Sequence, residues 1–280
     1  MPVAIVTDSA AALPPEIARE WSIAVVPMWL TFDGTAVREG EMSLDELLTH
    51  PEVKTSGPSP GEFAAVIEDQ LADADGVVLL TIASEMSTTH EAAVLGARAV
   101  DAEVRVVDTR TAAGAEALVV LAAAEAAASG APIDAVVAAA EVAIPQMRLV
   151  ATVPSLEHLV RGGRVPNIAG WAGNVLGIAP LFEFRSGHAR PLRPALGTEA
   201  AYDRILSRWR RDRVPGAELH VAALHANART DAQRLLDVVR EQVEPKTSFI
   251  GEFGTVMVAH TGPGLVGLAW RWAGPDGPAD

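Results

Sequence analysis

The stretch Gly76–Ala83, with the sequence GVVLLTIA, is an uninterrupted apolar run that contains β-branched residues. Such runs are typical of strands covered on both faces, as in parallel sheets. Val3–Thr7 and Val104–Asp108 are similar runs, and amphipathic stretches separate the three. Ala24–Phe32 is expected to be a further strand that ends in a turn at Asp33-Gly34. The first half of the chain is therefore predicted to be α/β, with a mainly parallel sheet.

Capping signals mark where helices should begin. Ser43 with Glu46, and Ser59 with Glu62, have the spacing of a capping box, in which two residues satisfy free N–H groups of the first turn. Pro60 directly follows Ser59, and proline suits the first helical position. Both segments are predicted helix starts.

Residues 112–145 form the most apolar region of the chain. Charged residues and helix breakers interrupt it at Glu116, Glu125, Gly130, Pro132, Asp134, Glu141 and Pro145. No charge-free run there approaches the roughly 20 residues that a membrane span needs, so we expect buried helices. Because Met1-Pro2 leads into a strand without a basic segment, secretion is disfavoured and a cytoplasmic protein is expected.

The pattern changes after Pro145, and 280 residues are enough for two domains. We expect an N-terminal α/β domain over residues 1–147 and a C-terminal α+β domain with a mixed sheet over residues 148–280. A cleft between two domains is the default place for a ligand. Later strands are expected near residues 149–153, 178–184, 190–194, 219–225, 248–259 and 265–272. Helices are expected near residues 155–160, 199–211 and 230–243, the last with a capping box from Thr230 and Gln233.

Composition argues against several classes of partner. The formal net charge is −14, and the lysines are Lys54 and Lys246, so a nucleic-acid partner is not expected. The absence of cysteine removes disulfides, thiolate metal sites and cysteine nucleophiles. His220 and His225 are separated by an odd number of positions on an expected strand, so they face opposite sides. No metal site is expected.

Two glycine-containing motifs are interpreted structurally. Gly57–Gly61 (GPSPG) matches the G-x-S-x-G pattern of a hydrolase nucleophile elbow. That elbow needs an N–H from the residue after the serine, which here is Pro60, and proline has none. Ser59 is therefore interpreted as a helix cap. Gly262–Gly267 (GPGLVG) matches the dinucleotide pattern G-x-G-x-x-G, but only 13 residues follow it, which favours turn glycines.

Four polar segments lie where a strand is expected to end or a helix to begin: Asp8-Ser9, Thr55–Pro60, Ala83–Thr89 and His260–Gly264. The carboxyl ends of parallel strands line the ligand crevice of such sheets, and helix N-termini there offer N–H groups to an anion. Small hydroxyls at these positions suit a carboxylate head group. The alternative is that each serine or threonine only caps its own helix.

Together these segments resemble the DegV family of fatty-acid-binding proteins over essentially the whole chain. The resemblance is carried by Val6–Pro15 (VTDSAAALPP), Thr55–Phe63 (TSGPSPGEF), Glu157–Val165 (EHLVRGGRV) and His260–Gly264 (HTGPG). It implies that one long-chain fatty acid lies in a tunnel between the two domains.

By this resemblance Thr55, Ser87 and His260 contact the fatty-acid carboxylate, and Ser56 and Thr261 adjoin those contacts. The sequence departs from the family at Ala83–His90 (ASEMSTTH), where the family commonly has S-S-G-L-S-G-T-Y, so both glycines are lost. The choice between Ser84 and Ser87 as the contact therefore stays open.

Arg164 matches a family arginine near the tunnel mouth, with a role in head-group charge or partner docking. Its alternative is a surface salt bridge.

The resemblance implies a lipid-binding carrier and not an enzyme. Such a carrier presents the carboxylate to a separate ATP-dependent fatty acid kinase, which forms an acyl phosphate for phospholipid synthesis. Neither lysine follows a glycine, so the sequence has no P-loop, and no cofactor is expected besides the bound fatty acid. Membrane contact is expected to be transient. Two alternatives stay open: a lipid hydrolase that uses Ser59, Ser87 and His260, and a lipid sensor or storage protein without a kinase partner.

Overall fold

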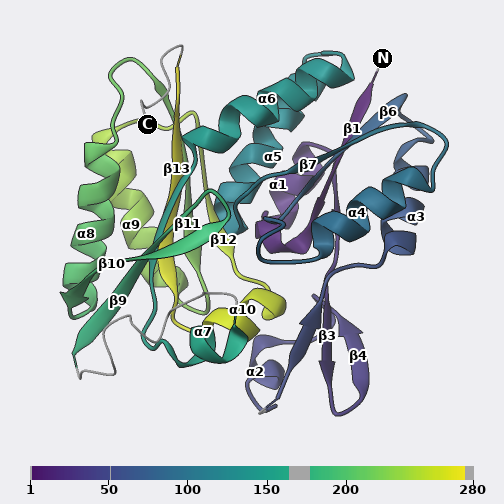
Figure 1. The fold of residues 1–280 in the computed structure, drawn as a ribbon. Coiled ribbons are helices and arrows are strands. Elements are labelled where there is room, and N and C mark those ends of the chain that lie inside the picture. The colour runs from purple at the N-terminus through teal and green to yellow at the C-terminus, as the bar shows by residue number, and fades with distance from the viewer. Residues whose placement is uncertain (1, 51, 164–176, 275–280) are drawn as a thin grey trace.

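The computed structural model describes residues 2–50, 52–163 and 177–274 (Figure 1). Its first sheet is parallel, with four strands in the order β2-β1-β6-β7. The strands are β1 (Val3–Asp8), β2 (Ile23–Val26), β6 (Gly76–Thr81) and β7 (Glu103–Asp108). Every residue of β6 is buried, as expected for the apolar run that begins at Gly76.

Helices cover both faces of this sheet. Val77 and Leu79 pack in one cluster with Phe63 of α3 (Pro60–Gln70), and α3 lies beside α4 (Thr89–Arg98). Side chains alternate along a strand, so Val78 and Leu80 belong to the cluster on the other face. That face carries α5 (Ala113–Ala128) and α6 (Ile133–Gln146). The short η1 (Ser9–Ala11) and α1 (Pro15–Glu20) connect β1 to β2.

The second sheet has six strands in the order β10-β9-β8-β13-β11-β12. Only the pair β11 and β12 is parallel among its neighbours, so the sheet is mixed. The strands are β8 (Arg148–Thr152), β9 (Ile178–Arg185), β10 (His188–Leu196), β11 (Glu218–His225), β12 (Thr247–Glu252) and β13 (Val266–Ala273). α8 (Thr198–Arg211) and α9 (Arg229–Gln242) pack on it. The α/β fold class, with a parallel first sheet and a mixed second sheet, is confirmed.

The two larger sheets share one helical layer. α5 contacts β1 and β6 of the first sheet and β11 and β13 of the second, and it lies between them in Figure 1. Twelve consecutive residues of α5, from Ala113 to Ala124, are buried. A helix that is apolar on all sides is stable only when it is enclosed, so the expectation of a buried helix is confirmed for α5. α6 buries only one face.

A small antiparallel sheet lies below the first sheet in Figure 1. Its strands, in the order β4-β3-β5, are β3 (Trp29–Phe32), β4 (Thr35–Arg38) and β5 (Lys54–Ser56). The one-turn α2 (Leu44–Leu47) belongs to the same segment. α10 (Thr255–Thr261) contacts α2, β3 and β5 as well as α7 (Glu157–Gly162). The small sheet therefore meets the C-terminal half of the chain through α10.

Three expectations for individual elements are wrong. Ala24–Phe32 forms two strands in different sheets, because Pro27 between β2 and β3 has no N–H for a ladder. The expected strand 248–259 ends at Glu252, and α10 follows. Thr230 and Gln233 form no capping box, because α9 begins at Arg229 with Ala228 as its N-cap and no side-chain cap.

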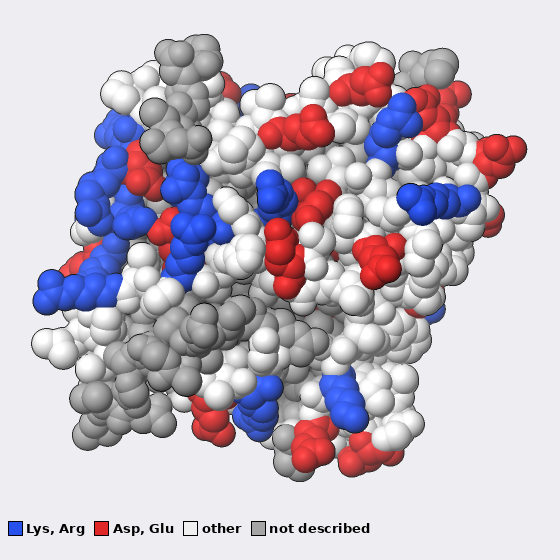
Figure 2. Space-filling model, viewed as in Figure 1, with Lys and Arg blue, Asp and Glu red and all other residues white. Residues whose placement is uncertain are grey.

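Arginine side chains gather on one side of the molecule. Figure 2 shows them over β9, β10 and α8, whereas acidic side chains predominate over the first sheet and its helices. Some of these arginines have structural roles. Arg208 of α8 pairs with the buried Glu183 of β9, and Arg204 donates to the carbonyl oxygen of Arg193 on β10. The cluster therefore helps to hold α8 on the edge of the second sheet.

Candidate functional site

A cavity of about 400 Å³ lies where the small sheet, α10 and the loop after β6 come together. Its apolar wall is formed by Met28, Ile82, Met86, Leu159, Val256 and Met257. Its polar wall is formed by Thr55, Ser56, Ser84, Glu85, Ser87, Thr88, His260 and Thr261. All five residues that the resemblance implies for carboxylate binding thus line one cavity. Arg164, the sixth candidate, falls outside the described residues.

One short polar contact in this wall joins β5 to α10. Thr55 Oγ1 lies 2.7 Å from His260 Nε2, although the two residues are 205 positions apart in the sequence. Gly162 of α7 lies on the other side of the imidazole, where a Cβ atom would come within 3.0 Å of His260 Nδ1. The ring is therefore held between a hydroxyl and a residue that has no side chain.

The loop between β6 and α4 adds a second pair of hydroxyls. Ser87 Oγ lies 2.7 Å from Thr89 Oγ1, and the Thr89 N–H donates to Ser87 Oγ at 3.3 Å. Thr89 also lies against Gly57, where a Cβ atom would be 2.3 Å from Thr89 Oγ1. The segment after β5 and the loop after β6 are thus in direct contact, and glycine at position 57 makes that contact possible.

Ser84 and Ser87 both line the cavity but differ in their partners. Ser84 is exposed and donates its hydroxyl proton to Asp108 Oδ2 at 2.6 Å. Ser87 is half-buried and shares one hydrogen bond with Thr89. A pair of hydroxyls uses one proton for its own bond and keeps the other. The Ser87 pair therefore retains a donor for a ligand, whereas the Ser84 proton is already used.

Thr261 is buried, and its hydroxyl is used within α10. Thr261 Oγ1 donates to the carbonyl oxygen of Met257 at 3.0 Å. Its contribution to the cavity wall is therefore steric, and the hydrogen bond secures the last turn of the helix that carries His260. Ser56, in contrast, is exposed at the end of β5.

Glu39, which directly follows β4, determines where α10 begins. Glu39 Oε1 accepts a hydrogen bond from the Val256 N–H at 2.8 Å, and its other oxygen accepts one from Ser9 Oγ. A Cβ atom at Gly254 would lie 2.2 Å from Glu39 Oε1, so only glycine fits there. Burial raises the pKa of the Glu39 carboxyl, and the bonds from Ser9 and Val256 oppose that shift. The sequence holds no signal for this contact, which spans 217 positions.

Asp8 and Ser9 are not among the described lining residues of the cavity, but each accepts a hydrogen bond from the backbone of a residue that lines it, Ile82 and Met28 respectively. Asp8 is fully buried and accepts N–H bonds from Ala10 and Ile82, both at 2.9 Å. Burial raises the pKa of the Asp8 carboxyl to about 7, and these two hydrogen bonds limit the shift. Since Ile82 opens the loop that carries Ser84 and Ser87, Asp8 fixes the start of that loop.

The turn between β9 and β10 reaches the rim of the cavity. The Gly187 N–H donates to the Arg110 carbonyl oxygen at 2.7 Å. A Cβ atom at Gly187 would lie 2.5 Å from the Glu85 carboxylate, so this glycine, whose φ is +81°, packs closely on Glu85. Glu85 stands where the family pattern has its first glycine. A glycine from the second sheet thus accommodates the larger residue.

A second cavity, of about 740 Å³, adjoins the first. Both have Thr55, Gly162 and His260 in their walls, so the pair of Thr55 and His260 lies at their junction. The second cavity carries more charge than the first. Its ionisable residues are His50, Glu52, Lys54, His158, Arg161 and His260.

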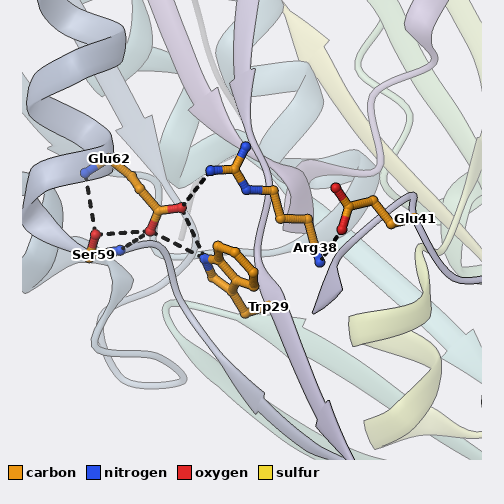
Figure 3. Close-up of polar contacts among 5 residues, drawn as sticks. All are labelled: Trp29, Arg38, Glu41, Ser59 and Glu62. Atoms are coloured by element: carbon orange, nitrogen blue, oxygen red, sulfur yellow. Dashed lines mark hydrogen bonds and ion pairs between the residues drawn. The ribbon is translucent and has the colours of Figure 1, made fainter. Parts of the chain in front are cut away.

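Ser59 is part of a helix cap, as interpreted from its motif (Figure 3). Ser59 Oγ accepts from the Glu62 N–H at 3.3 Å, and Glu62 Oε2 accepts from the Ser59 N–H at 2.8 Å. Glu62 also accepts from Trp29 Nε1 at 3.0 Å and lies 3.5 Å from Arg38 Nη2. The capping box is confirmed, and it additionally ties α3 to the small sheet.

Within the described ranges, no group of three or more histidine, cysteine or acidic side chains is arranged to hold a metal ion. His220 faces Thr247, with Nδ1 and Oγ1 3.1 Å apart, and His225 Nδ1 accepts from the Ala228 N–H. The same part of the chain contains no helix with the length and apolar character required for a transmembrane span.

Comparisons with known proteins assign the family. The DegV family model, described as an uncharacterised protein, matches residues 2–272. A DegV domain-containing protein of Streptomyces coelicolor is 37% identical over 274 residues, which cover 95% of this chain and 97% of that protein. A protein of Thermotoga maritima named fatty acid-binding protein is 29% identical and matches 96% of this chain and 97% of its own length.

A solved structure gives the same result. The structure of a DegV family protein from Thermus thermophilus, described for its fatty acid binding, superposes with a TM-score of 0.90 at 28% identity and covers 97% of this chain and 100% of that chain. Sequence and fold thus agree along the whole length, and the chain belongs to the DegV family.

Proposed function

We propose that the chain binds one long-chain fatty acid in a tunnel between domains 1–147 and 148–280, with the carboxylate held at Thr55 and His260. The observation that carries the proposal is the 2.7 Å contact of these two side chains across 205 positions, in the lining of a cavity that also has six apolar lining residues. The fatty acid binding described for the relatives from Thermotoga maritima and Thermus thermophilus supports the choice of ligand.

The head-group chemistry follows from the hydrogen-bonding capacity of the pair. With the proton on Nε2, His260 donates to Thr55 Oγ1, and the Thr55 hydroxyl then donates to the carboxylate. A bound carboxylate favours this tautomer because it needs a donor. The pair of Ser87 and Thr89 supplies a second donor. Each charge-assisted bond contributes about 1.5–3 kcal/mol, and without such bonds a buried carboxylate would be protonated or expelled.

The acyl chain supplies most of the binding energy. Burial of apolar surface is worth about 0.8 kcal/mol per methylene before ordering costs. Three of the apolar wall residues are methionines: Met28, Met86 and Met257. Their flexible thioether side chains adapt to irregular apolar surfaces, which suits an alkyl chain better than a rigid aromatic wall would.

The proposed role is that of a carrier that presents the carboxylate to a separate kinase. A carboxylate oxygen attacks the terminal phosphorus of ATP held by that partner. The new bond joins this oxygen to phosphorus, the bond from phosphorus to the bridging oxygen breaks, and ADP leaves. The product is an acyl phosphate for phospholipid synthesis. The position of Thr55 and His260 at the junction of the two cavities supports this role, because the carboxylate there faces a second space.

The contacts of the candidate nucleophiles do not favour a serine hydrolase. A serine nucleophile needs a base within hydrogen-bonding distance. Ser87 bonds Thr89, Ser59 belongs to the cap of α3, and His260 bonds Thr55. A lipid sensor or storage protein would use the same carboxylate site without a kinase partner.

Native mass spectrometry of the purified protein, before and after denaturation, tests the proposal. We expect one long-chain fatty acid per chain, released on denaturation. Protein that binds no fatty acid, even after incubation with one, would contradict it. Turnover of acyl esters that is lost in Ser87→Ala would instead establish the hydrolase.

A further inference from the structure

We propose that the second cavity is a binding site for the phosphoryl group of a long-chain acyl phosphate, with Lys54 and Arg161 as its cations. This inference rests on the proposed function, because the acyl phosphate is the product that forms when a carboxylate bound at Thr55 and His260 accepts a phosphoryl group. The inference adds to the proposed fatty acid site a separate site for the phosphoryl group of the acyl phosphate.

The position of the cavity supports the inference. Thr55, Gly162 and His260 belong to the walls of both cavities. A carboxylate at the junction keeps its alkyl chain in the first cavity, among Met28, Ile82 and the other apolar residues. A phosphoryl group attached to its oxygen would then be directed toward the second cavity, whose volume of about 740 Å³ accommodates such a group.

Lys54 is unusual in this chain. It is one of two lysines in a protein with a formal net charge of −14. Lys246, the other lysine, is neutralised by Glu125 at 2.8 Å and Glu218 at 3.1 Å. Lys54 precedes Thr55 in β5, and within the described part of the chain it has no acidic partner within ion-pair distance. An uncompensated cation in the wall of a cavity is well suited to an anionic group.

Arg161 and His158 provide further donors from α7. Arg161 Nη2 lies 3.3 Å from His158 Nδ1, so Nδ1 is the acceptor and the imidazole proton is on Nε2. Burial lowers the pKa of His158, and the neighbouring guanidinium adds to the effect, which agrees with a neutral ring. Arg161 also pairs with Glu157 at 3.7 Å, but both side chains are more than half exposed, so solvent screens this pair.

The charges in the two cavities differ in sign. Glu85 is the acidic residue among the described lining of the first cavity, which has no lysine or arginine. The second cavity has Lys54 and Arg161 against Glu52, together with His50, His158 and His260. His50 pairs with Asp33 at 3.4 Å, and its charge is offset when it is protonated. A phosphoryl group carries up to two negative charges, so the second cavity favours it more strongly than it favours a carboxylate.

The test compares two ligands on the full chain. The first is a long-chain fatty acid, and the second is the 2-oxoalkylphosphonate of matched chain length, in which a methylene replaces the hydrolysable bridging oxygen. Dissociation constants are measured for the wild type, Lys54→Met, Arg161→Met and the double variant. Lys246→Met is the control, since it removes the other lysine and changes the net charge equally.

We expect the preference for the phosphonate over the fatty acid to fall by about tenfold in each single variant and further in the double variant, because each variant removes one charge-assisted bond to the phosphoryl group. The control should keep the wild-type preference. The wild-type affinity for the phosphonate should also fall more steeply with salt than the affinity for the fatty acid.

The outcomes separate this inference from the proposed function. If the wild type binds no fatty acid, the proposed function fails. If fatty acid binds but the variants keep the wild-type preference, or lose both ligands equally, only the phosphoryl site is overturned. Inorganic phosphate that displaces the phosphonate at equal concentration would also overturn it, because the cavity would then recognise free phosphate and not an acyl phosphate.

Discussion

Thr55 and Ser59 are four positions apart in one motif, yet their hydroxyls have different kinds of partner. Ser59 is satisfied within its own turn, by the N–H of Glu62 at the start of α3. Thr55 is satisfied by His260, which is 205 positions away on α10. A hydroxyl with a local partner stabilises a helix end, whereas one whose partner comes from a remote element depends on the whole fold. The second kind is the better candidate for a ligand site.

Glu62 connects the two ends of this motif physically. It closes the capping box with Ser59, and it accepts a hydrogen bond from Trp29 on the small sheet that also carries Thr55 (Figure 3). Arg38 lies 5.1 Å from the centre of the Trp29 ring and next to Glu62. The local cap therefore helps to hold β3, whose neighbour β5 presents Thr55. The following substitutions separate the structural end of the motif from the proposed binding end.

His260→Ala is expected to have the largest effect on ligand binding. Without the imidazole the Thr55 hydroxyl is no longer oriented toward the carboxylate, and loss of that charge-assisted bond costs about 1.5–3 kcal/mol, which corresponds to roughly 10- to 100-fold weaker fatty acid binding. Thermal stability should change little, because the ring is only half-buried. Titration with a fatty acid and a melting curve measure the two quantities. His188→Ala, an exposed histidine outside the cavity, is the control. Equal affinities for wild type and His260→Ala would remove His260 from the proposed site.

Gly57→Ala is expected to lower both the stability of the protein and its affinity for the fatty acid. The new Cβ atom would lie 2.3 Å from Thr89 Oγ1, so Thr89 and its partner Ser87 must move. We expect a loss of about 1–3 kcal/mol in the free energy of unfolding and weaker fatty acid binding. Chemical denaturation measures the first and ligand titration the second.

Gly61→Ala is the matched control for Gly57→Ala. A Cβ atom at position 61 meets nothing within 4 Å, and alanine is favoured over glycine in a helix. This variant should be neutral or slightly stabilising. If Gly57→Ala behaves in the same way, the close contact between the two segments is not present in solution.

Ser59→Ala should change stability alone. Loss of an N-cap hydroxyl should lower the free energy of unfolding by about 1 kcal/mol, which chemical denaturation measures. The affinity for the fatty acid should stay at the wild-type value. Ser59→Asp should restore the stability, because aspartate is an equally good N-cap. A tenfold loss of affinity in Ser59→Ala, with rescue by neither aspartate nor added stabiliser, would mean that Ser59 has a role beyond the cap.

The smallest expected effect is a pH dependence at Glu62. Slight burial raises the pKa of this carboxyl, but the hydrogen bonds from Ser59 and Trp29 and the charge of Arg38 together lower it below 4.5. Its contribution to stability is therefore present above pH 4.5 and is lost as the pH falls through the pKa of the folded state. The difference in unfolding free energy between wild type and Glu62→Gln should shrink below about pH 4. A difference that grows with acidification would contradict this assignment.

The same contrast explains which features could be predicted. The cap at Ser59, the buried strand β6 and the buried helix α5 are predicted correctly, because each depends on spacing or composition within one segment. The cavity wall around Thr55 and His260 was anticipated only through motifs that resemble a known family. No spacing rule relates residues 205 positions apart.

α10 shows why the other features could not be predicted. Its sequence, TVMVAHT, is rich in β-branched residues and was expected to continue a strand. In the structure Glu39, 217 positions earlier, accepts the N–H of Val256 in the first turn of this helix, and Gly254 leaves room for that carboxylate. Tertiary contact outweighs local propensity at this point, and it determines the orientation of His260.

The sequence by itself determined the alternation of buried strands and helices, the cap of α3 and an acidic composition with two lysines, since these follow from local periodicity, spacing and counts. Only the tertiary structure decided which hydroxyls share a wall with His260, that Glu39 begins α10, and that two cavities of different charge meet at Thr55. The physical reason is that hydrogen bonds and cavity walls form between surfaces, and the fold brings those surfaces together from remote parts of the chain.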